Sequence, residues 1–419
     1  MLTTWEGMLV PIPEGRDRQS LTARVLKVAE SVPFPAFRVK KGRLYAAEVV
    51  GSVQVSGVRI NVLPKTDTQE GHRDADFLLN ILRAAGYLNR AHAGSGAVRV
   101  SVRDPLEAMI SEVASEMSMA MKDGVPRRYQ EKREDSKTLR GRIDFTRLST
   151  RLPSDQTVLP IRHTPLTIDN DLARCLGWIA STLVRLTRSS VNRQLLANMV
   201  ARLSRFSVGP AVAPQFAALR LSPAEAQWER VLAVGRLLLQ GRFADPTFSG
   251  ANNSFSMLFP LQHLFERAMR RILADTMQGY GITVRHRADS IFLLHGQDDH
   301  EGVLRLKPDY LFYRGTDLVA VGDAKWKRLA EGGRAHGAGR DDLYQINAYL
   351  DRFDVQNAIV FMPMANWMTP VWTKRYSVPQ SGRVIHLVGV DVESLVSHRK
   401  DICERARAAL GGILVGLVQ

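Results

Sequence analysis

The sequence predicts a mixed α+β or α/β protein, in which a β-rich and helical N-terminal module precedes a C-terminal α/β domain. Residues 44–63 alternate apolar and polar side chains, whereas residues 74–240 repeat apolar side chains at helical spacing. After residue 250 the order of predicted elements is helix, strand, hairpin, helix, two strands and a helix. At 419 residues the chain is too long for one core, and about 100–200 residues per domain predicts two or three domains.

The composition favours a polyanionic partner. Lys and Arg number 57 against 42 Asp and Glu, which leaves a formal charge of +15. The longest apolar runs are far shorter than the roughly 18–20 residues of a membrane-spanning helix, so nucleic acid is a better partner than a membrane. Two distant cysteines cannot form a disulfide framework or a zinc site, and no secretory signal is evident. We therefore expect a cytoplasmic protein without a membrane partner.

The N-terminal region, residues 1–245, divides into a β-rich part over 1–73 and a mainly helical part over 74–245. The β-rich part is predicted from a hairpin whose apolar positions are Val53, Val55, Val58, Ile60 and Val62. The helical part contains amphipathic segments at 74–88, 104–124, 170–186 and 224–242.

The segment 241–254 combines Gly, Pro, Asn and Ser without periodicity and is the best domain boundary in the chain. We therefore expect a second domain over residues 250–419. Its elements are a helix at about 257–278, a hairpin at 304–329, a helix at about 341–352, and strands at 357–363 and 383–392.

The register of the 304–329 hairpin decides whether its charged residues can meet. A three-residue turn at 315–317 would pair Arg314 with Leu318, and Asp309 would then lie opposite Asp323. A slip of one residue would move Asp309 to the other face of the sheet.

Under that register Asp309, Asp323 and Lys325 share one face and predict a metal site for phosphodiester hydrolysis. Two facing carboxylates repel, and oxygen ligands select Mg²⁺, with Mn²⁺ as an alternative. The metal would polarise the scissile phosphate, while Lys325 would hold the attacking water or stabilise negative charge in the transition state. An unperturbed lysine, with a pKa near 10.4, is a poor general base at neutral pH.

An Asp-x-Lys pattern alone is a weak signal, and a structural ion pair between Asp323 and Lys325 is the alternative. A second copy, Asp135-Ser136-Lys137, lies in a polar run without strand pattern and is interpreted as solvated surface. The hairpin copy differs because it lies in an apolar strand 14 residues after the only Pro-Asp of the chain, at Pro308.

Two flanking helices add candidate residues. Glu266 lies at the edge of the apolar stripe of the 257–278 helix and could reach the metal through water; alone, it reads as a solvated residue. In the 341–352 helix, Gln345 and Tyr349 lie on one face and could reach the DNA backbone or the catalytic residues. Tyr349 taken singly reads as a core residue.

Taken together, Glu266, Pro308-Asp309, Asp323-Ala324-Lys325 and Gln345-x-x-x-Tyr349 resemble the PD-(D/E)xK nuclease superfamily with a RecB-like Gln-x-x-x-Tyr motif. This resemblance implies a restriction-endonuclease-like fold for 250–419. It also implies metal ligation by Asp309, Asp323, the backbone carbonyl of Ala324 and, through water, Glu266. Further segments at 51–67, 124–148, 164–183 and 257–269 resemble the McrC family, the nuclease subunit of modified-cytosine restriction systems.

The resemblance to McrC implies partners as well as chemistry. Members of that family work in a hetero-oligomer with McrB, an AAA+ GTPase ring that binds the GTP and reads modified cytosine in double-stranded DNA. Residues 1–245 would then dock onto and activate the ring, with 124–148 as one candidate contact surface. Three alternatives are a nuclease of this fold serving another motor or unmethylated sites, a non-catalytic activator of the ring, and plain DNA binding.

Overall fold

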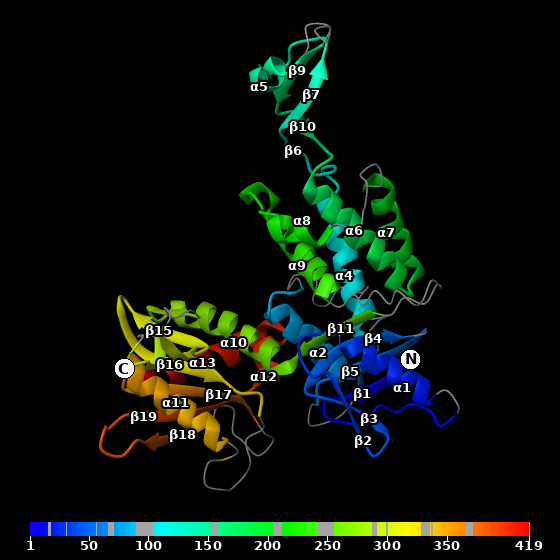
Figure 1. Ribbon diagram of the computed structural model, residues 1–419. Helices are drawn as coiled ribbons and strands as arrows, with labels where there is room; N and C mark the ends of the chain where they lie inside the picture. The colour runs from blue at the N-terminus through cyan, green and yellow to red at the C-terminus, as the bar shows by residue number, and fades with distance from the viewer. Residues whose placement is uncertain are drawn as a thin grey trace. The chain divides into compact units, whose positions relative to one another are not determined.

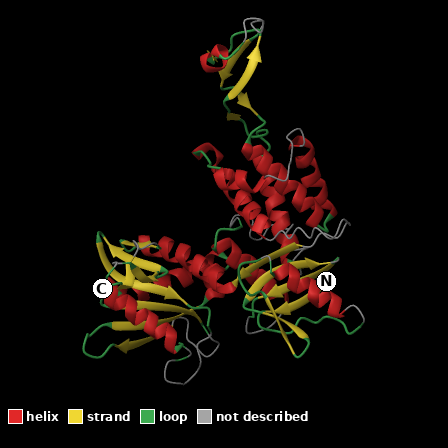
Figure 2. Ribbon diagram, viewed as in Figure 1, coloured by secondary structure: helices red, strands yellow, loops and turns green. Residues whose placement is uncertain are grey.

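The computed structural model describes residues 1–418 except 16–17, 31, 56, 66–70, 89–103, 152–157, 204–211, 241–254, 287–290, 299–300, 328–335, 337 and 365–371. The predicted boundary at 241–254 therefore lies outside the described residues. The chain forms two compact units: Met1–Met109 together with Gln240–Gln419, and Ile110–Leu239. Both α-helices and β-sheets are present, as predicted (Figures 1 and 2). None of the helices in the described ranges combines the length and apolar character that a membrane span requires.

The first unit contains a four-stranded sheet in the order β1 (Leu2–Trp5), β5 (Val58–Leu63), β4 (Val49–Val55) and β11 (Phe255–Pro260). The predicted hairpin is confirmed, with Val53 opposite Ile60. Strand β11 follows the helical region in the sequence and pairs antiparallel with β4. The N-terminal segment thus packs with residues 240–419, a division that differs from the predicted one at residue 245.

The helix predicted from about residue 257 begins later than expected, at Leu261. Residues 257–260 belong to β11, whose backbone pairs with β4, and Pro260 caps the helix α10 (Leu261–Gln278). The run Phe255-Ser-Met-Leu-Phe is buried on both faces, so its apolar residues could not be distinguished from a helical stripe in the sequence.

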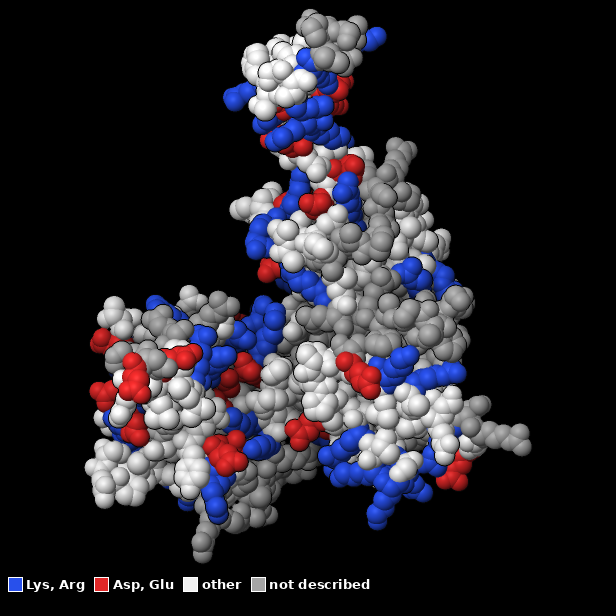
Figure 3. Space-filling model, in the orientation of Figure 1, with Lys and Arg blue, Asp and Glu red and all other residues white. Residues whose placement is uncertain are grey.

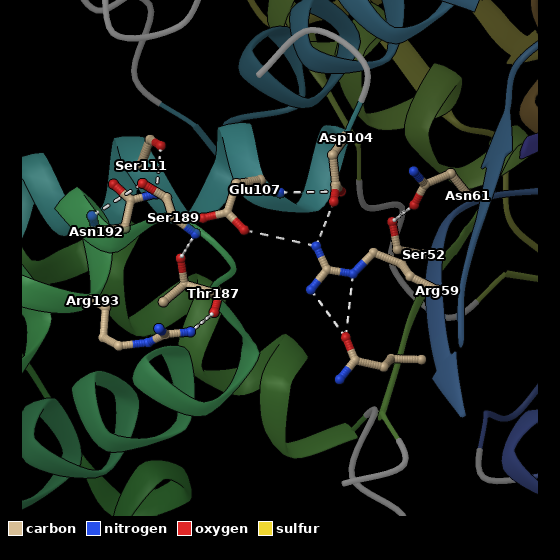
Figure 4. A network of polar contacts seen from close by, with 11 residues as sticks. Ser52, Arg59, Asn61, Asp104, Glu107, Ser111, Thr187, Ser189, Asn192 and Arg193 are labelled. Atoms are coloured by element: carbon tan, nitrogen blue, oxygen red, sulfur yellow. Dashed lines mark hydrogen bonds and ion pairs between the residues drawn. The ribbon is translucent and has the colours of Figure 1, made fainter. Parts of the chain in front are cut away.

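Smaller elements surround this sheet: α1 (Arg18–Ala29), β2 (Phe37–Lys40), β3 (Arg43–Ala46) and α2 (Gly71–Ala84). The buried Arg59 of β5 forms an ion pair with Asp104 at 2.5 Å and lies 3.8 Å from the Glu107 carboxylate. Figure 4 shows the Arg59 guanidinium facing these carboxylates. Its Nε and Nη2 also donate to Gln54 Oε1, at 3.3 and 3.0 Å. These partners compensate for the burial of the guanidinium charge.

The second sheet of this unit has six strands: β12 (Ile282–Arg285), β15 (Tyr310–Arg314), β16 (Asp317–Ala324), β17 (Asn357–Pro363), β19 (Val384–Val390) and β18 (Trp372–Ser377), in that order. Strands β16, β17 and β19 are parallel. Helix α11 (Arg340–Phe353) connects β16 to β17 and confirms the helix predicted at about 341–352. The predicted strands at 357–363 and 383–392 are confirmed as β17 and β19.

Helices cover the two faces of this sheet. The side chains of Ile346, Tyr349 and Leu350 on α11 pack with Leu311, Val321 and Val360 in one core. On the other face, Tyr310 and Phe361 meet edge to face and the Tyr310 hydroxyl donates to the Glu266 carbonyl of α10. Figure 1 shows α10 and α11 on either side of β16. The helices α12 (Val392–Val396) and α13 (Lys400–Leu417) complete the unit, with the small hairpin β13 (Ile291–His295) and β14 (Gly302–Leu306).

The second unit is mainly helical, as predicted. Its helices are most of α4 (Pro105–Ala120), α5 (Phe145–Ser149), α6 (Asp171–Leu186), α7 (Ser190–Leu203), α8 (Val212–Ala218), the 3₁₀ helix η3 (Pro223–Trp228) and α9 (Glu229–Gln240). The Asn170 side chain caps α6 by accepting from the Ala173 amide. In Figure 4 the Asn192 amide of α7 donates to Ser111 of α4, at 2.7 Å.

This unit also contains strands that the sequence did not predict: β6 (Arg128–Tyr129), β7 (Lys132–Ser136), β8 (Arg142–Ile143), β9 (Leu159–His163) and β10 (Leu166–Thr167). Asp135-Ser136-Lys137, interpreted as a run without strand pattern, in fact includes the end of β7, which pairs with β9. The Asp135 and Lys137 side chains are exposed, as expected. Because β7 is exposed along almost its whole length, it lacks the apolar alternation by which strands are recognised.

Candidate active site

The predicted turn of the β15–β16 hairpin is wrong, but the register at the other end of the hairpin, next to the carboxylates, is the predicted one. Arg314 pairs with Asp317 around a two-residue turn at Gly315-Thr316, so the register at the turn is one residue shorter than expected. A β-bulge then inserts Val319 between the pairs Tyr313–Leu318 and Phe312–Ala320. The bulge restores the register, and Tyr310 pairs with Gly322. Continuing this ladder by one residue places Asp309 opposite Asp323.

The contact that joins the two strands here is made by Asp309. Its Oδ2 accepts a hydrogen bond from the Ala324 backbone N–H at 2.8 Å. Strand β15 begins only at Tyr310, so the carboxylate takes the place of a backbone acceptor beyond the end of that strand. Asp309 is half-buried and follows the buried Pro308.

Asp323 and Lys325 lie on the same face, as the alternation of strand side chains predicts. The Lys325 Nζ is 2.8 Å from Asp323 Oδ2, and Asp323 is only 2% exposed. The ion pair that the sequence left as the alternative is therefore present. It does not exclude a metal site, because Asp309 shares the same corner of the sheet.

The electrostatics of the corner favour a bound cation. Burial raises the pKa of Asp309 to about 8, with further increases from the charges of Asp323 and Glu266. Burial also raises the pKa of Asp323, although Lys325 opposes the shift. Negative charge on neighbouring carboxylates thus disfavours the ionisation of Asp309 and of Asp323, and a divalent cation beside them would relieve the repulsion.

Lys325 is surrounded by acceptors. Besides Asp323, its ammonium donates to Gln345 Oε1 at 3.0 Å and lies 3.8 Å from the Asp342 carboxylate. Burial alone would lower the pKa of Lys325, but the carboxylates of Asp323, Asp342 and Asp309 together outweigh that effect and the pKa is raised. The side chain therefore remains protonated at neutral pH.

Asp342 lies in the first turn of α11. Its carboxylate accepts from the Gly339 amide at the N-terminus of α11 and from Lys327 at 2.6 Å. Burial opposes the charge, but the hydrogen bond from Lys327 holds the pKa of Asp342 below its usual value. Asp342 thus remains ionised beside Lys325, a role for which sequence spacing alone gave no signal.

Gln345 and Tyr349 lie on one face of α11, as predicted, but they differ in exposure. The Gln345 amide donates to the Tyr349 hydroxyl at 2.6 Å, and this hydroxyl donates to the Lys307 carbonyl at 3.1 Å. Tyr349 is 1% exposed, and its ring packs in the core beneath α11. Its contacts orient Gln345, and through Gln345 they orient Lys325.

Glu266 comes from the helix on the opposite face of the sheet. It is half-buried rather than fully solvated, and its charge contributes to the raised pKa values of Asp309 and Asp323. Helix α10 therefore brings this carboxylate within electrostatic range of the pair.

Gln262 is a site residue that the sequence analysis missed. Its Nε2 donates to the Ala324 carbonyl at 2.6 Å, and its Oε1 accepts from the Trp326 backbone N–H at 2.6 Å. The Ala324 carbonyl is the backbone group expected to bind the metal. Only the position of Gln262, one turn before Glu266 on α10, could have drawn attention to it.

Two carboxylates and a backbone carbonyl suit Mg²⁺, which keeps several waters, better than a metal that needs three or more side-chain ligands. Among the described residues, no group of three or more His, Cys, Asp or Glu side chains is arranged to hold a metal ion. Mg²⁺ binds through one or two carboxylates and keeps several waters, so Asp309, Asp323 and a carbonyl oxygen suffice. The Ala324 carbonyl has two lone pairs, of which Gln262 uses one.

Two solved structures share the fold of the chain. A chain of the Thermococcus gammatolerans complex described as a "refined half-complex from tetradecameric assembly" of McrB AAA+ hexamers with bound McrC is 16% identical, with a TM-score of 0.65 over 98% of this chain and 99% of that chain. The cryo-EM structure of the McrBC complex from the same organism gives 18% identity and a TM-score of 0.51, over 66% of this chain and 88% of that chain. No curated protein matched the sequence.

The sequence itself decides the family. The family model described as "McrBC 5-methylcytosine restriction system component" matches residues 44–362, which is more than half of the chain and includes the carboxylate pair, Lys325 and α11. The chain belongs to the family of McrBC 5-methylcytosine restriction system components.

Proposed function

We propose that this family member is the Mg²⁺-dependent DNA endonuclease subunit of a GTP-dependent, McrBC-type restriction system, and that its six-stranded sheet with α10 and α11 is a PD-(D/E)xK nuclease fold. The observation that carries the proposal is the meeting of Asp309, Asp323 and Lys325 at one corner of the sheet. Restriction of phage and other foreign DNA is the role that follows from this activity.

Each residue has a distinct task in the proposed cleavage. Asp309, Asp323 and the Ala324 carbonyl would hold Mg²⁺, with Glu266 reaching it through water; Mn²⁺ would fit the same oxygen ligands. When bound, the metal polarises the scissile phosphate and activates a water. Lys325 remains an ammonium, so it stabilises the negative charge of the transition state rather than abstracting a proton. Gln345, oriented by Tyr349, holds Lys325.

The partner in this proposal is a McrB-like AAA+ GTPase ring that binds GTP and reads modified cytosine in double-stranded DNA. One of the similar solved structures is an assembly of McrB AAA+ hexamers with bound McrC, which supports a hetero-oligomer. We place the ring contact on the second unit, within the predicted docking region 1–245. There the described acidic residues between 128 and 167 pair internally: Glu131 with Arg133, Glu134 with His163, Asp135 with Arg147 and Arg151, and Asp144 with Arg162.

This pairing leaves an outward basic surface, defined by Arg127, Lys132, Lys137, Arg140 and Arg142. All five side chains are exposed, and Figure 3 shows Lys and Arg gathered over β7 and β9. Exposed apolar residues accompany them: Tyr129, Leu139 and Phe145 are 74%, 59% and 70% exposed. Exposed apolar side chains mark interaction sites, and aromatic residues and Arg are enriched in protein interfaces.

The test is a cleavage assay with the full chain, the AAA+ partner, GTP, Mg²⁺ and methylated or unmethylated DNA. We expect cleavage of methylated DNA that requires every component, and its loss in Asp323→Asn while stimulation of the partner GTPase is retained. Cleavage without methylation or with another motor would favour the alternative nuclease. GTPase stimulation by a wild-type chain that never cleaves DNA would favour a non-catalytic activator.

A further inference from the structure

The side-chain amide of Gln262 forms hydrogen bonds to the backbone on both sides of Lys325. Gln262 donates to the carbonyl before Lys325 and accepts from the N–H after it, both at 2.6 Å. On the opposite edge, the Lys325 N–H donates to the Phe361 carbonyl of β17 at 2.9 Å. Strand β16 ends at Ala324, so Gln262 extends its hydrogen bonding past the last paired residue.

Asp309 and Gln262 bind the two backbone groups of Ala324 at the unpaired edge of β16. Alternate backbone groups of a strand point to the same side, so the N–H and carbonyl of Ala324 both face the side on which β15 has not yet begun. The N–H is taken by Asp309 and the carbonyl by Gln262. Gln262 therefore controls where the Ala324 carbonyl points relative to Asp309.

Trp326 connects this strand end to the N-terminal sheet. The indole Nε1–H lies 3.4 Å from Glu6 Oε1, and the same oxygen accepts from the Lys65 backbone N–H at 3.1 Å. The ring also stacks on Phe77 of α2, with centroids 6.3 Å apart, and meets Phe265 of α10 edge to face. Glu6 follows β1 and Lys65 follows β5, so residues more than 250 positions away in sequence fix the end of the catalytic strand.

We infer that Gln262 and Trp326 are positioning residues that hold the Asp323–Lys325 strand end in register with Asp309, and that Glu6 anchors them to the N-terminal sheet. This inference rests on the proposed function. It assigns part of the N-terminal region to the support of the metal site, in addition to any contact with a partner. Side chains that orient metal ligands change metal affinity when they are removed, even though they do not touch the metal.

Mn²⁺ binding to the whole chain tests the inference without relying on cleavage. Binding is measured as the decrease in the electron paramagnetic resonance signal of free Mn²⁺. We expect Gln262→Ala to weaken Mn²⁺ binding about tenfold, and Glu6→Ala to weaken it less, by about threefold. Two matched controls should bind like the wild type: Gln278→Ala, at an exposed glutamine of the same helix, and Glu14→Ala, at an exposed N-terminal glutamate that pairs with Arg18 on the surface.

A second variant distinguishes the loss of a positioning contact from a general loss of stability. Gln262→Glu retains the acceptor for the Trp326 N–H and loses the donor to the Ala324 carbonyl, so we expect intermediate binding with an unchanged thermal midpoint. Hydrogen exchange of the Trp326 amide should rise in Gln262→Ala and stay protected in Gln262→Glu.

The outcomes distinguish this inference from the proposed function. If Asp323→Asn abolishes Mn²⁺ binding but Gln262→Ala and Glu6→Ala bind like the wild type, the positioning roles are wrong and the metal site stands. If the wild type binds no more Mn²⁺ than Asp323→Asn does, the metal site is overturned and the positioning roles with it.

Discussion

The Ala324 backbone N–H donates to the Asp309 carboxylate across the β15–β16 hairpin, at 2.8 Å. This bond fixes one carboxylate beside the strand that carries the other, at the point where β15 has not yet begun. It also fixes the side of the sheet on which Asp309 lies, which the sequence could only infer from an assumed turn.

Replacing Lys325 by Met should lower DNA cleavage by at least about 100-fold, because the transition state loses its preorganised positive charge. The measurement is single-turnover cleavage with saturating partner and Mg²⁺. Lys374→Met is the matched control, since Lys374 is exposed on the edge strand β18 of the same sheet. Equal activity of the two variants would remove Lys325 from the mechanism.

Asp309 makes the metal-free protein sensitive to pH. Its folded-state pKa, raised to about 8 by burial, lies above its unfolded value of 3.8. Its contribution to stability is therefore fully present below about pH 4 and is lost as the pH rises toward 8. Asp309→Asn should raise the free energy of unfolding of the metal-free protein, relative to the wild type, by about 1–3 kcal/mol more at pH 8 than at pH 5. A shift of one pKa unit corresponds to about 1.4 kcal/mol, and solvent screening reduces the total. Urea denaturation in EDTA at both pH values measures this; a variant that gains nothing at pH 8 contradicts it.

Reversing charge on the basic surface should weaken the partner contact without touching the metal site. For Lys137→Glu combined with Arg140→Glu, we expect at least about a tenfold higher concentration for half-maximal stimulation of the partner GTPase, with an effect that diminishes at high salt. Lys400→Glu serves as control, because Lys400 is 88% exposed at the start of α13 in the other unit. If the control lost as much stimulation as the double variant, the docking surface would lie elsewhere.

Gly51 links the N-terminal sheet to β11, and Gly51→Ala should destabilise the protein by at least about 3 kcal/mol. The residue has φ of +127°, and an added Cβ would lie 2.1 Å from the Met257 carbonyl oxygen. Thermal unfolding measures the loss. In contrast, Gly412→Ala in α13, where an added Cβ meets nothing within 4 Å, should be neutral or stabilising by up to about 1 kcal/mol. A wild-type midpoint for Gly51→Ala would show that β4 and β11 can separate at little cost.

The sequence predicted much of the six-stranded sheet because its parallel strands are buried and its helix α11 is amphipathic. The same reasoning failed for β7, which is exposed, and for the start of α10, where an apolar strand runs directly into an apolar helix. Each failure occurred where burial did not leave the usual periodic pattern.

For the site, the spacing of residues along the chain showed which residue types were available and that Asp323 and Lys325 share a face, because strand parity depends only on spacing. The remaining geometry depends on how distant segments pack. The bulge at Val319 corrected the register, α10 supplied Gln262, and the N-terminal sheet supplied Glu6 beside Trp326. These contacts join residues up to 320 positions apart. They form only when the packing of separate elements brings such segments together, and no local pattern in the chain records that packing.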